Sequence, residues 1–150
     1  MTRYALMQNP AEVMPGIAAL LRENWSETGF GFEFAPDAGT YQRAVDLGVM
    51  FIIAAYDDPH LIGYCTMTVT PHLHNPAIKV AANDALFVRP DRRGYAAGRL
   101  MLEAEREAVR RGATQVVWRT RIGTDLPAAL AKRGYVPVDV GMLKELNHGN

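Results

Sequence analysis

The sequence has little cysteine and no excess of charge of either sign. Cys65 is the single cysteine, so the chain can form no internal disulfide and contains no cysteine-rich zinc module. Sixteen Lys and Arg residues balance sixteen Asp and Glu residues. Because a neutral chain has no global field that favours polyanions, we expect no nucleic-acid partner.

Long apolar runs are also missing. The most apolar stretch, Val49–Ala55, is far too short to span a bilayer. The residues after Met1 lack the apolar segment of a signal peptide. These absences predict a cytoplasmic protein with no membrane partner.

The residues that are present suffice for one domain. The chain has 150 residues, of which 49% are apolar, and this is ordinary for a globular chain that buries one core. No internal repeat or low-complexity tract divides it. We therefore expect a single domain over residues 1–150.

The first half of the chain predicts two helices and then strands. Apolar residues at helical spacing indicate a helix over Pro10–Trp25, with Pro15 in its first turn or at a kink. Glycine and proline mark Ser26–Thr40 as a loop, and Asp37–Leu47 predicts a second short helix. Four further segments follow: strands over Val49–Tyr56 and Leu61–Thr70 that form an antiparallel hairpin, an irregular connection over Pro71–Ala82, and a strand over Ala85–Val88.

The second half alternates helix and strand. Ala97–Arg111 carries an apolar stripe and a charged outer face, as an amphipathic helix does. Gln115–Thr120 predicts a strand, Asp125–Arg133 a short helix, and Val136–Leu146 a final strand or two. This order predicts an α/β protein with a parallel step across the long helix.

The turn before the long helix is the segment that suggests chemistry. The first turn of a helix has free N–H groups and the positive end of the helix dipole, and small residues let an anion approach them. Arg92, Arg93 and Arg99 add positive charge nearby. We therefore predict a phosphate or pyrophosphate cradle, the alternative being a plain glycine turn with solvated arginines. The P-loop and dinucleotide-binding fingerprints are absent.

The turn and its flanks have the pattern Val88-x-Pro90-x-x-Arg93-Gly94-x-Ala96-x-Gly98. This pattern resembles the coenzyme A motif of the GNAT superfamily of N-acetyltransferases, which is Gln/Arg-x-x-Gly-x-Gly/Ala. Ala128–Tyr135 also resembles the family's helix that ends in a glycine and an aromatic residue. The resemblance covers about Val49–Leu146, and the two N-terminal helices more loosely.

The resemblance implies a fold, an activity and a co-substrate. The implied fold is α/β (α+β): a mixed, mostly antiparallel sheet with a parallel, splayed strand pair around the long helix and helices on both faces. The implied activity is N-acetyl transfer, in which an amine of a small molecule or peptide attacks the thioester of acetyl-CoA directly. No metal is implied, and a homodimer is left open. The alternatives are a domain that binds coenzyme A without catalysis, and a structural component.

The resemblance also assigns residues to the coenzyme A site. It implies that the backbone N–H of Val88 polarises the thioester carbonyl, and that the pantetheine arm runs between Leu86–Val88 and Gln115–Thr120. The residues it places around the pyrophosphate are Arg93, Gly94, Tyr95, Ala96, Ala97, Gly98 and Arg99.

Two positions depart from the family's pattern. Ala96 stands where the family has the first glycine of the motif, and its methyl group narrows the approach of the pyrophosphate. Leu130 stands where many members carry a tyrosine that protonates the leaving thiolate. Either another group serves as the acid or none is used, because a coenzyme A thiolate is a tolerable leaving group.

Candidate residues for the acceptor side are less specific. Asp84 lies four residues before Val88 and could act through a water as general base, or could only make hydrogen bonds at the strand start. Glu27, Phe30 and Phe32 lie in the loop where the family builds its acceptor site, although the phenylalanines could simply cover the core.

The histidines and the cysteine give weaker signals. His72 and His74 form an HxH pair that lies on one side of an extended strand, but no third zinc ligand is evident. We therefore predict no metal. The two histidines are interpreted as surface or acceptor-pocket residues, with His72 assigned to the acceptor pocket and either one a reserve candidate for the general base. Cys65 lies in an apolar strand and is interpreted as a small buried hydrophobic residue.

Overall fold

The structure of the protein is a computed structural model that describes residues 1–146, apart from the side chains of residues 11–13. The chain divides into two compact units, Met1–Arg119 and Thr120–Asn150. The first unit contains a β-sheet and its covering helices, and the second contains one short helix.

Five strands form the sheet of the first unit, in the order β1-β2-β3-β4-β5 over the described residues. They are β1 (Thr2–Leu6), β2 (Met50–Asp57), β3 (His60–His72), β4 (Asn75–Val88) and β5 (Gln115–Val117). Neighbouring strands are antiparallel except β4 and β5, which are parallel. The predicted mixed, mostly antiparallel sheet with one parallel pair is confirmed.

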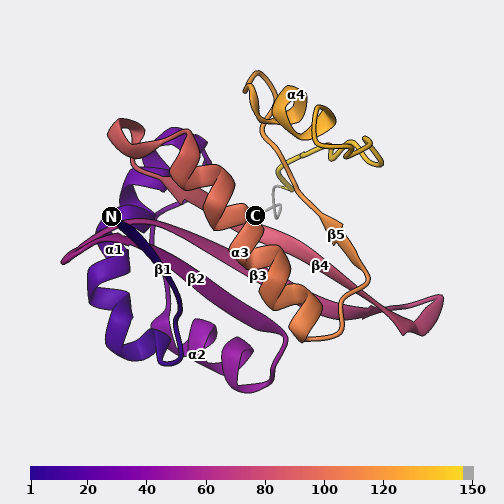
Figure 1. Cartoon of the computed structure of the whole chain (residues 1–150), viewed down its shortest axis with the longest axis horizontal. Coiled ribbons are helices and arrows are strands. Elements are labelled where there is room, and N and C mark those ends of the chain that lie inside the picture. Colours follow the sequence, from indigo (N-terminus) through magenta and orange to yellow (C-terminus); the bar gives the residue numbers. More distant parts are fainter. Residues whose placement is uncertain (147–150) are drawn as a thin grey trace. The chain divides into compact units, whose positions relative to one another are not determined.

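Helices cover both faces of this sheet (Figure 1). The helices are α1 (Pro10–Thr28), α2 (Ala38–Asp46), the 3-10 turn η1 (Pro90–Arg92) and α3 (Tyr95–Arg110). Helices α1 and α2 lie on one face and α3 on the other. Asp37 begins α2 because its carboxylate accepts hydrogen bonds from the N–H groups of Gly39 and Thr40.

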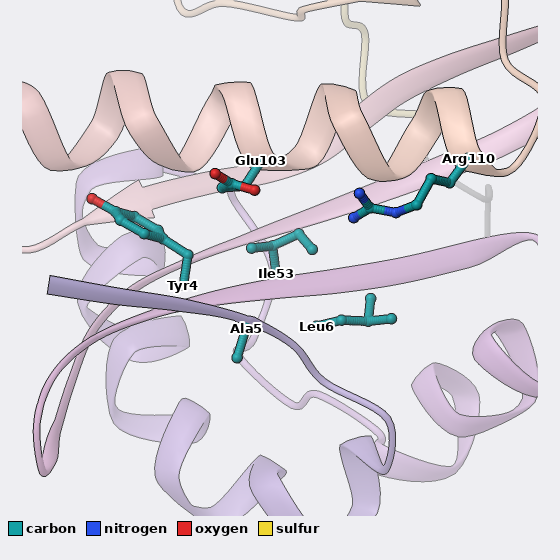
Figure 2. Close-up of a pocket in the computed structure, with 6 residues that line it drawn as sticks. All are labelled: Tyr4, Ala5, Leu6, Ile53, Glu103 and Arg110. Atoms are coloured by element: carbon teal, nitrogen blue, oxygen red, sulfur yellow. The ribbon is translucent and has the colours of Figure 1, made fainter.

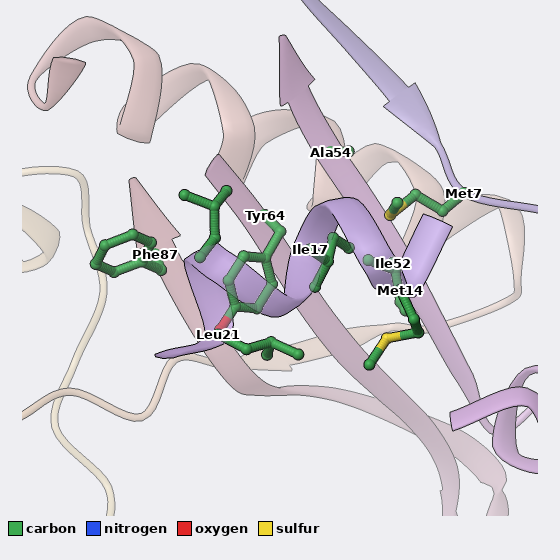
Figure 3. Close-up of a cluster of buried hydrophobic side chains, with 9 residues drawn as sticks. Met7, Met14, Ile17, Leu21, Ile52, Ala54, Tyr64 and Phe87 are labelled. Carbon is green, nitrogen blue, oxygen red and sulfur yellow. The ribbon is translucent and has the colours of Figure 1, made fainter. Parts of the chain in front are cut away.

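The hydrophobic core follows the alternation of the strands. Ile52 and Ala54 of β2 point toward α1 and belong to one buried cluster with Tyr64 and Phe87 (Figure 3). Their neighbours Phe51 and Ile53 are equally buried but point to the other face. Helix α3 covers that second face with its predicted apolar stripe, which includes Leu100, Met101, Ala104 and Ala108.

One segment that we predicted to be irregular belongs to two strands that pair with each other. Within 71–82, β3 continues to His72 and β4 begins at Asn75, with the turn at residues 73–74. The two prolines misled the prediction, because proline removes a ladder donor. Pro71 is accommodated next to a register irregularity near the end of the hairpin.

Both ends of the chain also differ from the prediction. Thr2–Leu6 is a short edge strand that pairs with β2, although its mixed polar sequence gave no strand signal. Helix α1 runs to Thr28 with Pro15 inside it, so the loop that follows is shorter than expected. In the second unit, α4 (Leu126–Ala131) is the predicted short helix.

The predicted final strand is wrong for the described residues. Residues 136–146 contain neither helix nor strand. Val136, Val138 and Val140 alternate as in a strand but are exposed. Alternation alone does not make a strand without a neighbour to accept its hydrogen bonds, and Pro137 lacks a donor.

Candidate functional site

The loop from β4 to α3 forms an exposed bend in the first unit. After Val88 the chain makes the turn η1 and then reaches Gly94, whose φ of 93° is in the region that favours glycine. A Cβ added at Gly94 would meet nothing within 4 Å. The backbone around Gly94 is therefore open to a ligand.

The first turn of α3 presents backbone amides without a side-chain cap. Gly94 is the N-cap residue and has no side chain to accept a hydrogen bond. The first bond of the helix runs from Gly98 N–H to Gly94 O at 3.2 Å, so the amides of Tyr95, Ala96 and Ala97 have no acceptor four residues back. These amides and the helix dipole form the donor set that an anion requires.

Ala96 does not obstruct this donor set. The residue is buried, with 7% of its surface exposed, so its methyl group does not project into solvent. Its carbonyl accepts a hydrogen bond from the Tyr4 hydroxyl at 3.4 Å. The alanine that departs from the family's pattern is therefore accommodated by packing.

The arginines near the bend all have acidic partners. Arg92 pairs with Asp57 at 2.7 Å, and Arg99 pairs with Glu103 at 2.8 Å. Arg93 pairs with Glu27 at 2.6 Å. We expected these arginines to add positive charge to the cradle, but the partners offset that charge, and the amides of α3 remain as the main donors.

The end of β4 is fixed so that the Val88 amide faces away from β3. Arg89 N–H donates to Ile62 O at 2.9 Å. Successive residues of a strand direct their N–H groups to opposite edges, and so Val88 N–H is directed toward the edge where β5 lies. Gly63 pairs with Val88, and a Cβ there would come within 2.8 Å of Phe87 O. Glycine therefore permits this close approach.

Strands β4 and β5 separate before β4 ends. They pair only from Val80–Ala82 to Gln115–Val117. Asn83 follows directly and is buried; its side-chain oxygen accepts from Arg119 N–H at 2.6 Å, and its side-chain nitrogen donates to Arg119 O at 3.2 Å. Asn83 thus connects the two strands at the point where their backbone pairing ends. Sequence reasoning missed it, because an asparagine within a strand gives no distinct signal.

Asp84 is the extra residue of a β-bulge. Thr66 pairs with Ala85 and Met67 with Asn83, so Asp84 has no cross-strand partner. Its exposed carboxylate lies 3.5 Å from the Thr66 hydroxyl. Burial raises the pKa of Tyr41 in α2, and the negative charge of Asp84 raises that pKa further. A bulge re-aims one side chain of a strand, here toward the face that α1 and α2 cover.

The aromatic residues after α1 form a partly exposed cluster. The Trp25 ring lies 5.1 Å from the Phe30 ring and 4.9 Å from the Phe32 ring. Phe30 and Phe32 are 46% and 66% exposed, so they form an aromatic surface and do not simply cover the core. Phe34 contacts Trp25 as well and packs against the core cluster that contains Tyr64. This surface therefore adjoins the face of the sheet that carries Asp84.

The histidine pair lies elsewhere in the first unit. His72 ends β3 and His74 lies in the turn, with the His74 N–H donating to His72 Nδ1 at 3.1 Å. Within the described residues no group of three potential ligands could hold a metal ion. Cys65 is fully buried, and burial raises the pKa of its thiol. The cysteine is therefore a packing residue, as predicted.

A small hollow beside β1 is separate from the bend. Its volume is about 80 Å³, which is room for a few water molecules at about 30 Å³ each. Figure 2 shows Tyr4 and Leu6 of β1 below Glu103 and Arg110 of α3, which line it. This hollow is too small for a nucleotide-bearing ligand.

Leu130 is in the second unit. It is a buried residue of α4, and its carbonyl accepts hydrogen bonds from Arg133 and Tyr135 N–H. Its hydrocarbon side chain cannot donate a proton.

The fold defines a structural class, the mixed sheets whose parallel strand pair separates beside a long helix. The chain belongs to the acetyltransferase (GNAT) family, whose sequence profile matches residues 17–135. Among curated proteins no significant sequence match is found.

Solved structures share the fold at low sequence identity. An aminoglycoside acetyltransferase from an uncultured soil metagenomic sample, in complex with sisomicin, is 14% identical with a TM-score of 0.78, covering 97% of both chains. A ribosomal-protein-alanine N-acetyltransferase from Brucella melitensis biovar Abortus 2308 is 18% identical with a TM-score of 0.76, covering 100% of this chain and 99% of the other. A predicted acetyltransferase with acetyl-CoA from Clostridium acetobutylicum is 16% identical with a TM-score of 0.69, covering 98% and 96%.

The helices give no sign of a membrane span. Over the part of the chain that the structure describes, none is both long and apolar enough to cross a bilayer.

Proposed function

We propose that this member of the family is an acetyl-CoA-dependent N-acetyltransferase. One observation carries the proposal: the uncapped first turn of α3 lies at the end of the strand that separates from β5. A helix start of the kind that can bind an anion and an opening between strands thus occur together in the first unit. A carrier with a diphosphate and a long arm fits this combination.

The amides at the start of α3 are the groups that would hold the diphosphate. Those of Gly94, Tyr95, Ala96 and Ala97 belong to the exposed bend or the uncapped turn. We extend the binding site to Arg93, Gly98 and Arg99, which the motif includes. When bound, acetyl-CoA supplies an activated acetyl group as a thioester.

Val88 and Asp84 are proposed for the chemistry of transfer. The Val88 N–H, directed away from β3, would polarise a carbonyl oxygen as an oxyanion donor does. Asp84 would accept the proton of the amine, directly or through a water. The bulge leaves Asp84 exposed, and its carboxylate accepts a long hydrogen bond of 3.5 Å from the Thr66 hydroxyl.

The acceptor is proposed to be an amine that carries an apolar or aromatic portion. Phe30 and Phe32 stack at 5.3 Å and leave large parts of their rings exposed. Aromatic faces bind both apolar groups and cations. We assign these two residues to the acceptor and leave His72 as a weaker candidate, because it lies at the distant end of the β3–β4 hairpin.

A second candidate function is coenzyme A binding without catalysis. Leu130 favours it, because leucine cannot protonate the leaving thiolate. Transfer remains feasible without an acid, since a thiol with a pKa of about 8.5 leaves readily near neutral pH.

We also propose that residues 1–150 act together as one domain.

One assay separates the two functions. Release of thiol from acetyl-CoA is measured with phenethylamine, spermidine, sisomicin and a peptide with an N-terminal alanine. Amine-dependent release supports the transferase. Calorimetric binding of coenzyme A without release for any amine supports the binding domain, and no binding contradicts both.

A further inference from the structure

Arg93 makes several contacts within the protein that the proposed pyrophosphate binding does not explain. Its Nε–H donates to the carbonyl of Val88 at 2.9 Å. Its Nη2 donates to both carboxylate oxygens of Glu27, at 2.6 and 2.7 Å. Its guanidinium also lies 5.7 Å from the centre of the Phe87 ring. The side chain therefore connects the end of β4 to the end of α1.

The two ends of this connection are the two sides of the proposed site. Val88 ends β4, and its N–H and C=O groups point to the same edge of the strand. Glu27 belongs to the last turn of α1, two residues after Trp25, on which Phe30 and Phe32 pack. The Glu27–Arg93 pair thus joins the aromatic surface to the residue that is proposed to face the thioester.

The pair contributes little to the stability of the fold. Its side chains are 43% and 47% exposed, and ion pairs at that exposure are weak because water screens them. Arg93 Nη2 donates to both carboxylate oxygens of Glu27 while its Nε–H donates to Val88 O, so the guanidinium is held from two sides and its direction is fixed. A weak but oriented contact between two sides of a site is suited to positioning.

We propose that Glu27 and Arg93 are positioning residues that hold the acceptor surface in register with Val88. The proposal rests on the proposed function of the site. Glu27 is then assigned to hold Arg93 and not to bind the amine. A shift of about 1 Å between reacting groups can lower turnover about 100-fold, so loss of this contact would reduce turnover more than binding.

Fluorine spectroscopy can test the connection directly. The chain has two tryptophans: Trp25 lies at the aromatic surface, and Trp118 follows β5, where its Nε1–H donates to Glu105 at 2.8 Å. In protein labelled with 5-fluorotryptophan, the Trp118 signal reports coenzyme A near the strand opening. The Trp25 signal reports transmission to the aromatic surface.

We expect coenzyme A to shift both signals in the unaltered protein. In Glu27→Gln we expect the Trp118 shift to persist and the Trp25 shift to be lost. Arg93→Gln should also lose the Trp25 shift, and it is measured at coenzyme A concentrations that saturate the Trp118 signal, because Arg93 also belongs to the proposed binding site. Glu23→Gln, one turn earlier on α1 and in no ion pair among the described residues, should behave as the unaltered protein. The positioning role of Glu27 and Arg93 is overturned if the Trp25 shift persists in Glu27→Gln. It is also overturned if the unaltered protein shows a Trp118 shift but no Trp25 shift. If neither signal shifts in the unaltered protein when coenzyme A is added, the proposed coenzyme A site is overturned as well.

Kinetics provide a second readout. With the amine that the panel identifies as the acceptor, Glu27→Gln should lower kcat about tenfold and leave the Kd of coenzyme A within about twofold. Glu27→Gln/Arg93→Gln should be no slower than Arg93→Gln, because Glu27 acts through Arg93. An additive effect, or a rise in the KM of the amine with kcat unchanged, would make Glu27 an acceptor-binding residue and contradict the proposal.

Discussion

Gly98 tests the anion site at the scale of one residue. Its N–H makes the first hydrogen bond of α3, and the motif places it beside the pyrophosphate. Glu at this position adds bulk and a negative charge at the positive end of the helix dipole. We expect Gly98→Glu to raise the Kd of coenzyme A at least about tenfold, which is about 1.4 kcal/mol, as measured by calorimetry.

The matched control for Gly98 is another helical glycine. Gly16 lies in α1, is exposed and has nothing within 4 Å of an added Cβ. Gly16→Glu should bind coenzyme A as the unaltered protein does. Equal affinity of the two variants would remove the first turn of α3 from the binding site.

Asp84 tests the proton acceptor at the same scale. Asn keeps the size of the side chain but cannot take a proton, so Asp84→Asn should lower kcat/KM about 100-fold at neutral pH. The Kd of coenzyme A should not change, because Asp84 lies in the bulge and not at α3. Asp84→Glu should recover part of the rate. Unchanged kcat/KM in Asp84→Asn would leave this residue with a structural role only.

The sequence predicted the local backbone of the site but not its contacts between distant residues. The small residues around Gly94 predicted an open turn, because their effect on the backbone is local. The pairing of Arg93 with Glu27 could not be predicted, because the two residues are 66 positions apart and meet only through the packing of α1 on the sheet. The bulge at Asp84 depends on register, which the sequence does not display.

At the scale of elements, Gly63 controls how closely β3 approaches the end of β4. A Cβ at Gly63 would lie 2.8 Å from Phe87 O and 2.9 Å from a methyl group of Val88. Because the backbone cannot move freely there, Gly63→Ala should destabilise the protein by about 1–3 kcal/mol. Chemical denaturation measures this change.

Gly16→Ala is expected to change stability in the opposite direction. Its Cβ meets nothing within 4 Å, and alanine in a helix interior is more stable than glycine by about 0.5–1 kcal/mol. The free energy of unfolding should therefore rise for Gly16→Ala and fall for Gly63→Ala. Similar values for both would mean that the strands can separate at Val88 without cost.

Elements with a strong period were predicted, and elements that depend on neighbours were not. Helix α3 and strand β2 have apolar patterns that determine their type. Strand β1 is short and of mixed polarity, and it exists because β2 pairs with it. The reverse case is the segment 136–146, whose alternating valines have the pattern of a strand but lack the pairing.

At the scale of the whole molecule, Glu107 connects stability to pH. It is buried on α3, with hydrogen bonds from Arg110 and Arg111 at 2.8 Å each. Burial by itself would raise the pKa of this carboxyl, but the hydrogen bonds and charges of the two arginines outweigh burial and lower it. A lowered pKa in the folded state means that ionised Glu107 stabilises the fold.

Acidification should remove the contribution of Glu107 to the stability of the fold. The contribution of Glu107 is complete above the ordinary carboxyl pKa of about 4.3 and is lost as the pH falls through the lower folded value. Glu107→Gln should lower the free energy of unfolding by about 1–3 kcal/mol at pH 7, and the difference should shrink on acidification. Urea denaturation from pH 7 to 3 measures it, with Glu23→Gln as an exposed control. A difference that does not depend on pH would assign the loss to packing.

The side chain of Asn83 has a consequence for the speed of ligand entry. Its amide takes both the donor and the acceptor role that a strand neighbour would take toward Arg119. Beyond Asn83, the described parts of β4 and β5 have no backbone pairing. No such hydrogen bond would therefore have to break before the proposed arm enters between the strands, and the opening is preorganised. Association of coenzyme A should then be limited by encounter, with an observed rate that rises linearly with ligand concentration and no plateau from a slow conformational step.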